Sequence, residues 1–174
     1  MKEYLRKNYK LILIKLSIIV VAIAIDLLSK HFLQKYFLEG GDKVDIINGV
    51  FSVTYTENRG VAWGLFEGKT IGIVITSIAF VGILVVWDIF NTDRHLLNYL
   101  GFSLILAGAI GNFVDRIFLG YVRDFFSFDF VNFPIFNFAD ICITIGCVLY
   151  VIYILFVYTR KDKKGSKDAK TKDN

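Results

Sequence analysis

Two aspartates stand where an apolar sequence would not be expected to carry charge. Asp140 opens a run that continues to Tyr158 without another charged residue, and Asp124 lies in the phenylalanine-rich segment before it. Carboxyl groups at membrane depth are expensive and are usually functional. If both face one cleft, their repulsion leaves one shared proton, as a pair that activates water and protonates a leaving group requires. Helix capping is the alternative for Asp140, since an aspartate at a helix N-terminus accepts backbone N–H groups.

Further polar residues lie inside the apolar runs. Asp26 and Lys30 are one helical turn apart and can pair, and we favour a structural ion pair over a direct chemical role. Asn112, Asp115 and Arg116 have i, i+3 and i+4 spacing, so they project from one side of a helix. A structural polar cluster explains these three, and we expect Asp115 to stay ionised beside Arg116. Glycines at three positions of the same helix would let another helix approach closely: 101, 108 and 111.

Other catalytic chemistries find little support in the residue inventory. The two histidines, His31 and His95, lie near the ends of different apolar runs, which disfavours a zinc hydrolase and a Ser–His pair. The sequence contains no glycine-rich phosphate loop. The two cysteines, at 142 and 147, are interpreted as buried packing residues. A binding site for a hard cation such as Mg²⁺ remains possible, because such cations prefer oxygen ligands. Its ligands would be Asp115, Asp124 and Asp140.

The elements that must position these residues are membrane helices. A mean hydropathy of +0.56, 55% hydrophobic residues and a single proline exclude an ordinary soluble domain of 174 residues. Four runs are long enough to span a bilayer as helices, at about 11–28, 70–90, 96–119 and 139–158. We therefore predict an all-α polytopic membrane protein, with one integral membrane domain over residues 1–159.

The charge distribution predicts the orientation. The first ten residues carry Lys2, Arg6, Lys7 and Lys10 against Glu3, and the tail over 160–174 has seven Lys or Arg against three Asp. Both basic ends belong in the cytoplasm, and the tail reads as disordered. A cleavable signal peptide ending in the Ala-Ile-Ala of residues 22–24 is the alternative for the N-terminus. Cleavage would leave three spans and would conflict with the basic tail.

The long connection between the first two spans then lies on the outer side. Within it, Asn48-Gly49 is flanked by β-branched and aromatic residues, which predicts a β-hairpin and a small sheet on the outer membrane surface. The segment over 120–136 is rich in phenylalanine and poor in charge, so we expect it to lie in the membrane interface. An active region would face outward.

Four blocks of the sequence together resemble the lipoprotein signal peptidase family, also called signal peptidase II. They occur in the family's order and cover nearly the whole chain outside its ends, so the combination is far more specific than any one motif. The blocks are DLLSK at 26–30, ENRGVAWGLF at 57–66, AGAIGNFVDRIFLGYVRDFF at 107–126 and FPIFNFADICITIG at 133–146.

The resemblance implies a bacterial inner- or plasma-membrane aspartyl protease with its active site near the outer leaflet surface. Its substrate would be a diacylglyceryl-modified prolipoprotein, cleaved before the lipidated cysteine. The catalytic acids would be Asp124 and Asp140. The resemblance further implies contact with membrane lipids, a monomer, and no cofactor, metal or nucleic acid. Substrate-pocket or supporting positions are Asn58, Gly60, Asn112, Arg116 and Asn137, and structural polar positions are Asp26, Lys30 and Asp115.

Two residues depart from the family pattern. Leu27 stands where the family often has glutamine, and Arg123 precedes Asp124 where a small apolar residue is more usual. An inward-facing Arg123 would lower the pKa of Asp124, so we expect it to face the lipid headgroups. Two other classes of function remain as alternatives: a small transporter or channel with charged residues at mid-membrane, and a metal-dependent lipid-phosphate enzyme.

Overall fold

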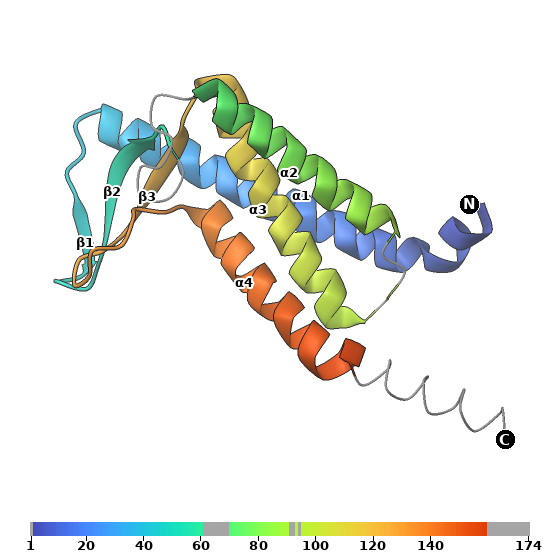
Figure 1. Cartoon of the computed structure of the whole chain (residues 1–174). Helices are drawn as coiled ribbons and strands as arrows, with labels where there is room; N and C mark the ends of the chain where they lie inside the picture. The colour runs from blue at the N-terminus through green and yellow to red at the C-terminus, as the bar shows by residue number, and fades with distance from the viewer. Residues whose placement is uncertain (1, 61–69, 91–92, 94, 160–174) are drawn as a thin grey trace, which may run out of the picture.

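Four long helices form most of the chain (Figure 1). The computed structural model describes residues 2–60, 70–90, 93 and 95–159. The helices are α1 (Lys2–Leu38), α2 (Thr70–Phe90), α3 (Leu96–Leu119) and α4 (Phe138–Tyr153), and α4 continues as the π-helical turn η2 (Ile154–Tyr158). Each has a stretch long and apolar enough to cross a membrane: Tyr9–Leu38, Gly72–Phe90, Leu96–Leu119 and Phe138–Tyr158. The predicted class, a polytopic helical membrane protein, is confirmed, although α1 extends beyond the predicted range of 11–28.

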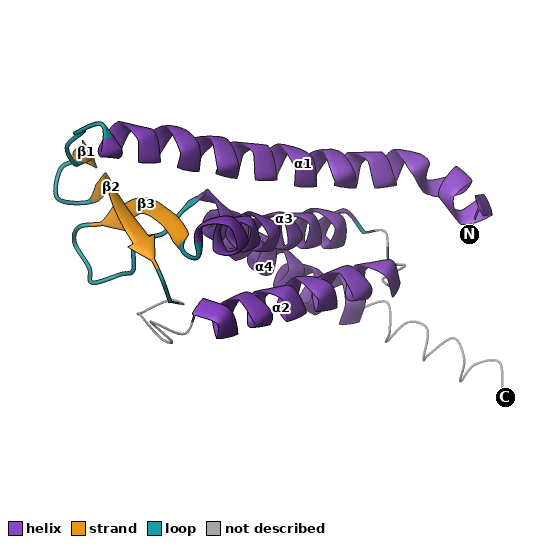
Figure 2. Cartoon of the chain, turned by 90° about the horizontal axis from the view of Figure 1, so that it is seen from above, coloured by secondary structure: helices purple, strands orange, loops and turns teal. Residues whose placement is uncertain are grey.

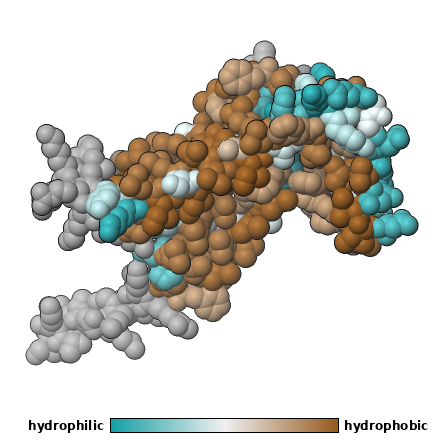
Figure 3. Space-filling view, turned by 180° about the vertical axis from the view of Figure 1, so that it is seen from behind, coloured by the Kyte–Doolittle hydropathy of each residue, from teal (hydrophilic) through white to brown (hydrophobic). Residues whose placement is uncertain are grey.

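Helix α3 is the centre of the bundle and packs against the other three helices (Figures 1 and 2). The buried apolar core joins its Phe102, Leu106 and Ala107 to Ile19 of α1 and Cys142 of α4. On the face shown in Figure 3, apolar side chains cover the helices and hydrophilic ones gather around the sheet. This distribution suits a bundle whose surroundings are lipid, since no water is available there to solvate polar groups.

Glycines set the close packing of α3 against its neighbours. A Cβ added to Gly146 of α4 would lie 2.6 Å from the carbonyl oxygen of Gly101 in α3. A Cβ on Gly108 would collide with the carbonyl oxygen of Ala139, and one on Gly111 with the carboxylate of Asp26. The expectation that the three glycines of α3 permit close helix approach is therefore confirmed.

A three-stranded antiparallel sheet lies at one end of the bundle (Figure 2). Its order is β1 (Val44–Ile47), β2 (Phe51–Asn58) and β3 (Val122–Phe128). The predicted hairpin is confirmed, with Gly49 at a φ of 70° in the turn, a conformation that favours glycine. The sequence did not predict β3, which pairs with β2 so that Asp124 lies opposite Thr56. The sheet thus brings the phenylalanine-rich segment to the helix ends.

Helix termini at the sheet end place polar groups near one another. Helix α3 ends at Leu119 and is capped by Gly120, whose φ of 80° is left-handed and whose N–H donates to the Arg116 carbonyl. The chain then turns directly into β3. Helix α4 begins after Asn137, which serves as its N-cap. The start of α1 and the end of α4 lie at the opposite end of the bundle from the sheet (Figure 1).

Candidate active site

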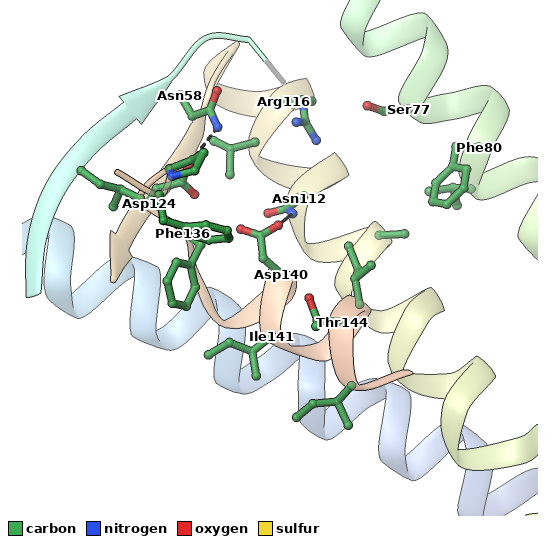
Figure 4. A pocket seen from close by; sticks show the side chains of 18 of the residues that line it. Asn58, Ser77, Phe80, Asn112, Arg116, Asp124, Phe136, Asp140, Ile141 and Thr144 are labelled. Atoms are coloured by element: carbon green, nitrogen blue, oxygen red, sulfur yellow. Dashed lines mark hydrogen bonds between the residues drawn. The ribbon is translucent and has the colours of Figure 1, made fainter. Parts of the chain in front are cut away.

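One cavity of about 570 Å³ holds both of the aspartates singled out from the sequence. Asp124 comes from β3 and Asp140 from the first turn of α4 (Figure 4). Its remaining lining is mostly apolar and comes from all the elements around it, including Ser77, Phe80 and Val81 of α2 and a run of α4 that ends at Ile145. The cavity therefore opens between helices α2 and α4 below the sheet.

Asp124 is buried and held by two side-chain amides. Its exposed fraction is only 1%. One carboxylate oxygen accepts a hydrogen bond from the Asn58 amide at 3.0 Å, and the other accepts one from the Asn137 amide at 2.6 Å. The Asn58 amide is itself oriented, because its oxygen accepts the backbone N–H of Gly60 at 3.0 Å. Asn58 and Gly60 thus fix one side of the carboxyl group.

Asp140 closes a capping box at the start of α4. The Asn137 side chain accepts the backbone N–H of Asp140 at 3.1 Å, and the Asp140 carboxylate accepts that of Asn137 at 3.1 Å. The second carboxylate oxygen accepts the Asn112 amide at 2.8 Å. Capping, the alternative role for Asp140, is thus present, although Asn137 rather than Asp140 is the N-cap residue. The Asp140 side chain therefore both caps α4 and lines the cavity.

Asn137 connects the two acids. Its side-chain nitrogen donates to Asp124, its backbone N–H donates to Asp140, and its amide nitrogen also lies 3.0 Å from the Asn112 oxygen. With an exposed fraction of 1%, this side chain has little freedom to rearrange. The positions of the two carboxyl groups are therefore coupled through one buried amide.

Burial raises the pKa of Asp124 from 3.8 to about 7. Desolvation is the largest cause, and the negative charge of Asp140 adds to it, whereas the amides of Asn58 and Asn137 and the charge of Lys30 act in the opposite direction. A carboxyl group with a pKa of about 7 exchanges protons readily at neutral pH. Asp124 can therefore serve as a proton donor in this cavity.

The buried cation Lys30 supports the site through its polar contacts. Lys30 of α1 is fully buried, and its ammonium lies 2.9 Å from Asp26, 3.5 Å from Asp115 and 3.1 Å from the Asn112 oxygen. The predicted pairing of Asp26 with Lys30 is confirmed. Asp26 also accepts the backbone N–H of Ala139 at 2.9 Å, which ties α1 to the start of α4. Because the Lys30 ammonium donates to the Asn112 side-chain oxygen, the Asn112 side-chain nitrogen is turned toward Asp140.

The prediction for Arg123 is wrong. Its guanidinium does not face lipid headgroups but pairs with Asp115 at 2.6 Å and donates to Gln34 of α1 at 3.2 Å. Successive residues of a strand point to opposite faces, so Arg123 turns to α1 while Asp124 turns to the cavity. A buried Asp115 also needs a cation to balance its charge, and its partners are Arg123 and Lys30 rather than the adjacent Arg116.

Arg116 instead lines the cavity with the two acids. Its Nε is buried and has no hydrogen-bond partner among the described residues. Figure 4 shows it on the same side as Asn58, above Asn112. A guanidinium in this position can bind a carbonyl or ester oxygen of a molecule in the cavity.

The structure also bears on the expectations for the two cysteines, for a metal site and for one motif residue. Cys142 is buried as predicted, but Cys147 is exposed on the outside of α4. Asp115 is not among the cavity-lining residues, and within the described part of the chain no three His, Cys, Asp or Glu side chains form a group that could hold a metal ion. Ala62, in the ENRGVAWGLF block that resembles the family, lies outside the described residues.

Two groups of residues at the site were missed from the sequence. The α2 lining, Ser77, Phe80 and Val81, lies in a continuous apolar run, which does not indicate which of its residues face a site. Gln34, which contacts Arg123, sits one turn beyond Lys30 on the same face of α1. That i, i+4 spacing was the one available signal for Gln34.

The fold and the cavity define a multi-pass membrane protein with an aspartate pair at one end of its helices. Residues 18–156 match the family model for signal peptidase (SPase) II, and the chain belongs to this family. It is 41% identical to a lipoprotein signal peptidase of Lactobacillus johnsonii, covering 80% of this chain and 89% of that protein. It is 36% identical to one of Clostridium acetobutylicum, covering 86% and 99%.

Solved structures show the same fold. A bacterial membrane enzyme determined by the in meso method at 2.3 Å resolution matches with a TM-score of 0.73 and 33% identity, covering 84% of this chain and 90% of that one. A second, at 1.9 Å resolution, matches with a TM-score of 0.69 and 33% identity, covering 82% and 93%.

Proposed function

We propose that this chain is an aspartic endopeptidase that removes the signal peptide from diacylglyceryl-modified prolipoproteins, cutting before the lipidated cysteine. The observation that carries the proposal is the pairing of Asp124 and Asp140 in one cavity through Asn137. Family membership supports the substrate class. Residues 1–159 act as a single peptidase domain, without a cofactor or a metal ion.

The two acids take different roles in the first step. Asp140 is less buried than Asp124, and its two carboxylate oxygens accept N–H hydrogen bonds from Asn112 and Asn137. Asp124, with its pKa raised to about 7, holds the proton. Asp140 removes a proton from water as the oxygen attacks the scissile carbonyl carbon. Asp124 gives its proton to the carbonyl oxygen, and a neutral tetrahedral diol results.

Collapse of the diol returns both acids to their starting states. Asp140 delivers the proton it took from water to the amide nitrogen as the C–N bond breaks. One diol hydroxyl returns its proton to Asp124 as the carboxylic acid of the signal peptide forms. The products are the signal peptide and a lipoprotein with a free amino group on its cysteine. No residue is covalently modified.

The other site residues position the substrate and the acids. Arg116 binds a carbonyl or ester oxygen of the substrate, and Asn58 and Gly60 hold Asp124. The buried charges of Asp26, Lys30 and Asp115 are structural and orient Asn112. The signal helix lies between α2 and α4, where the apolar cavity wall continues down the bundle.

The orientation follows from charge and from the fold. Both basic ends of the sequence are cytoplasmic, and α1 begins at the end of the bundle opposite the sheet (Figure 1). The sheet and the aspartate pair then lie at the outer surface of a bacterial plasma membrane. The lipid chains of the substrate stay in the outer leaflet while the peptide bond reaches the acids.

The experiment is proteolysis of a purified prolipoprotein, with and without its diacylglyceryl group, in excess chelator. Mass spectrometry of the products identifies the bond that is cut. We expect cleavage of the lipidated substrate before its cysteine, with the unlipidated form cut far more slowly. Cleavage at another bond, or activity only after Mg²⁺ is restored, would contradict the proposal.

A further inference from the structure

A second cavity, of about 440 Å³, lies between α2 and α4 at the end of the bundle away from the sheet. It is distinct from the cavity of the aspartate pair, and none of its lining residues belongs to that site. Five aromatic side chains and one carboxylate dominate its wall: Trp87, Phe90, Asp93, Tyr150, Tyr153 and Tyr158.

The carboxylate is held in place by neighbouring donors. Tyr153 donates its hydroxyl hydrogen to one Asp93 oxygen at 2.7 Å, and the backbone N–H of His95 donates to the other at 2.9 Å. The indole N–H of Trp87 donates to the Tyr150 hydroxyl at 3.2 Å, which joins α2 to α4 at the cavity. Aromatic faces around a fixed carboxylate attract a cation, by cation–π interaction and by charge. The chemistry of this cavity therefore suits a lysine or arginine side chain.

The two cavities lie along the same pair of helices. On α2 the lining passes from Ser77 to Phe90, and on α4 it passes from Asp140 to Ile145 and then from Tyr150 onward. At about 1.5 Å of rise per residue, the positions from Tyr150 to Tyr158 lie about 15 to 27 Å from Asp140 along the helix axis. A molecule that reaches the acids and extends along α2 and α4 toward the other end of the bundle would end in the second cavity.

A secretory signal peptide has matching dimensions and charge. It carries a positively charged segment, then about 7 to 15 apolar residues, and then the cleavage region. An apolar helix of that length spans about 10 to 22 Å, and a few extended residues before the cut bond add to it. With the cut bond at the aspartate pair, the basic segment falls within the range of the second cavity.

We propose that this second cavity binds the basic N-terminal segment of the substrate's signal peptide, with Asp93 as the charge that recognises it. The inference rests on the proposed peptidase function and adds a substrate contact at the far side of the membrane from the chemistry. Binding here sets the position of the signal helix along α2 and α4. The contact acts on substrate binding, because it lies too far from the acids to touch the reacting bond.

The test varies charge on both sides of this contact. Three lipidated substrates differ only in the basic segment: its lysines are kept, changed to glutamine or changed to glutamate. The cleavage kinetics of each are measured with the wild type, Asp93→Asn and Asp93→Lys. In the wild type, we expect neutral substrate to raise KM roughly three- to tenfold, with kcat unchanged. Asp93→Asn should remove most of this discrimination, and Asp93→Lys should reverse it in favour of glutamate.

Two controls separate this contact from general effects. Asp45→Asn removes an exposed acid on β1, at the other end of the molecule, and should keep full discrimination. Tyr153→Phe keeps the ring but loses the hydroxyl that holds Asp93, and should weaken discrimination partially. The substrate series in the wild type needs no variant to fold, so it tests the contact directly.

Each contrary outcome identifies what fails. Equal KM values for all three substrates in the wild type would overturn this inference and leave the peptidase function standing. No cleavage of any lipidated substrate would contradict the peptidase function itself. If Asp93→Asn changed activity only in bilayers containing an aminophospholipid, whatever the substrate charge, the cavity would be a lipid site and the inference would be wrong.

Discussion

Replacing Asp124 with asparagine should flatten the dependence of stability on pH. In the folded chain, burial raises the pKa of Asp124 from 3.8 to about 7, whereas the unfolded chain restores the ordinary value. Between these values the folded state holds a proton that the unfolded state has lost. This group therefore favours folding most at acidic pH, and that contribution is lost as the pH rises through about 7.

The size follows from the two pKa values. The difference between 3.8 and about 7 corresponds to about 4 kcal/mol over the full pH range, at about 1.4 kcal/mol per pKa unit. Between pH 5 and pH 8, the wild type should lose about 2.5 kcal/mol of unfolding free energy through this group. Asp124→Asn lacks the contribution. Its altered hydrogen bonds to Asn58 and Asn137 shift stability equally at every pH, so they leave the slope unaffected.

The assay is equilibrium unfolding in mixed micelles, followed by tryptophan fluorescence from pH 5 to pH 8. Asp129→Asn is the matched control, because a hydrogen bond and ion pair with Lys43 lower the pKa of Asp129 and its titration lies below this window. The control should keep the wild-type slope. Parallel curves for wild type and Asp124→Asn would refute the raised pKa and the proton-donor role built on it.

Three further predictions concern packing, buried charge and rate. Gly108→Ala should cost about 1–3 kcal/mol of unfolding free energy, since its Cβ has no room, whereas Gly82→Ala, in open space on α2, should stabilise by up to about 1 kcal/mol. In the same unfolding assay, Lys30→Met should cost about 3–5 kcal/mol, because it leaves the buried Asp26 carboxylate without its cation and Asp115 with Arg123 alone, and the exposed Lys35→Met should cost less than 1 kcal/mol. Measured against pH, kcat/KM should fall as pH rises through about 7, where Asp124 loses its proton; a flat profile from pH 6 to pH 9 would contradict this.

Sequence patterns were enough for the parts of the fold that depend on one segment at a time. Continuous apolar runs predicted the four helices, and Asn48-Gly49 predicted the hairpin, because both signals are local. The third strand was missed because its pairing depends on a partner far along the chain. The phenylalanine-rich segment lacks a strict alternation of apolar and polar residues, and its composition suits an interfacial segment, so only its contact with β2 identifies it as a strand.

The same distinction holds within the site. The residue types and the family resemblance pointed to Asp124 and Asp140, and the structure places both in one cavity. The orientation of Arg123 could not be predicted from the sequence, because it depends on the ion pair that Arg123 forms with Asp115 of α3, which the sequence does not show. Nor could spacing show that Asn137 bonds to both acids, since that requires the first residues of β3 to lie against the start of α4.

The most direct measurement is the cleavage rate of a diacylglyceryl-modified prolipoprotein by wild type, Asp124→Asn and Asp140→Asn in excess chelator. Folding of each variant is checked beforehand by its unfolding transition. The paired-aspartate mechanism predicts rapid cleavage by the wild type and a loss of several orders of magnitude in kcat for each variant, because neither half of the proton transfer can be made by an amide. Substantial cleavage by either folded variant would contradict the mechanism.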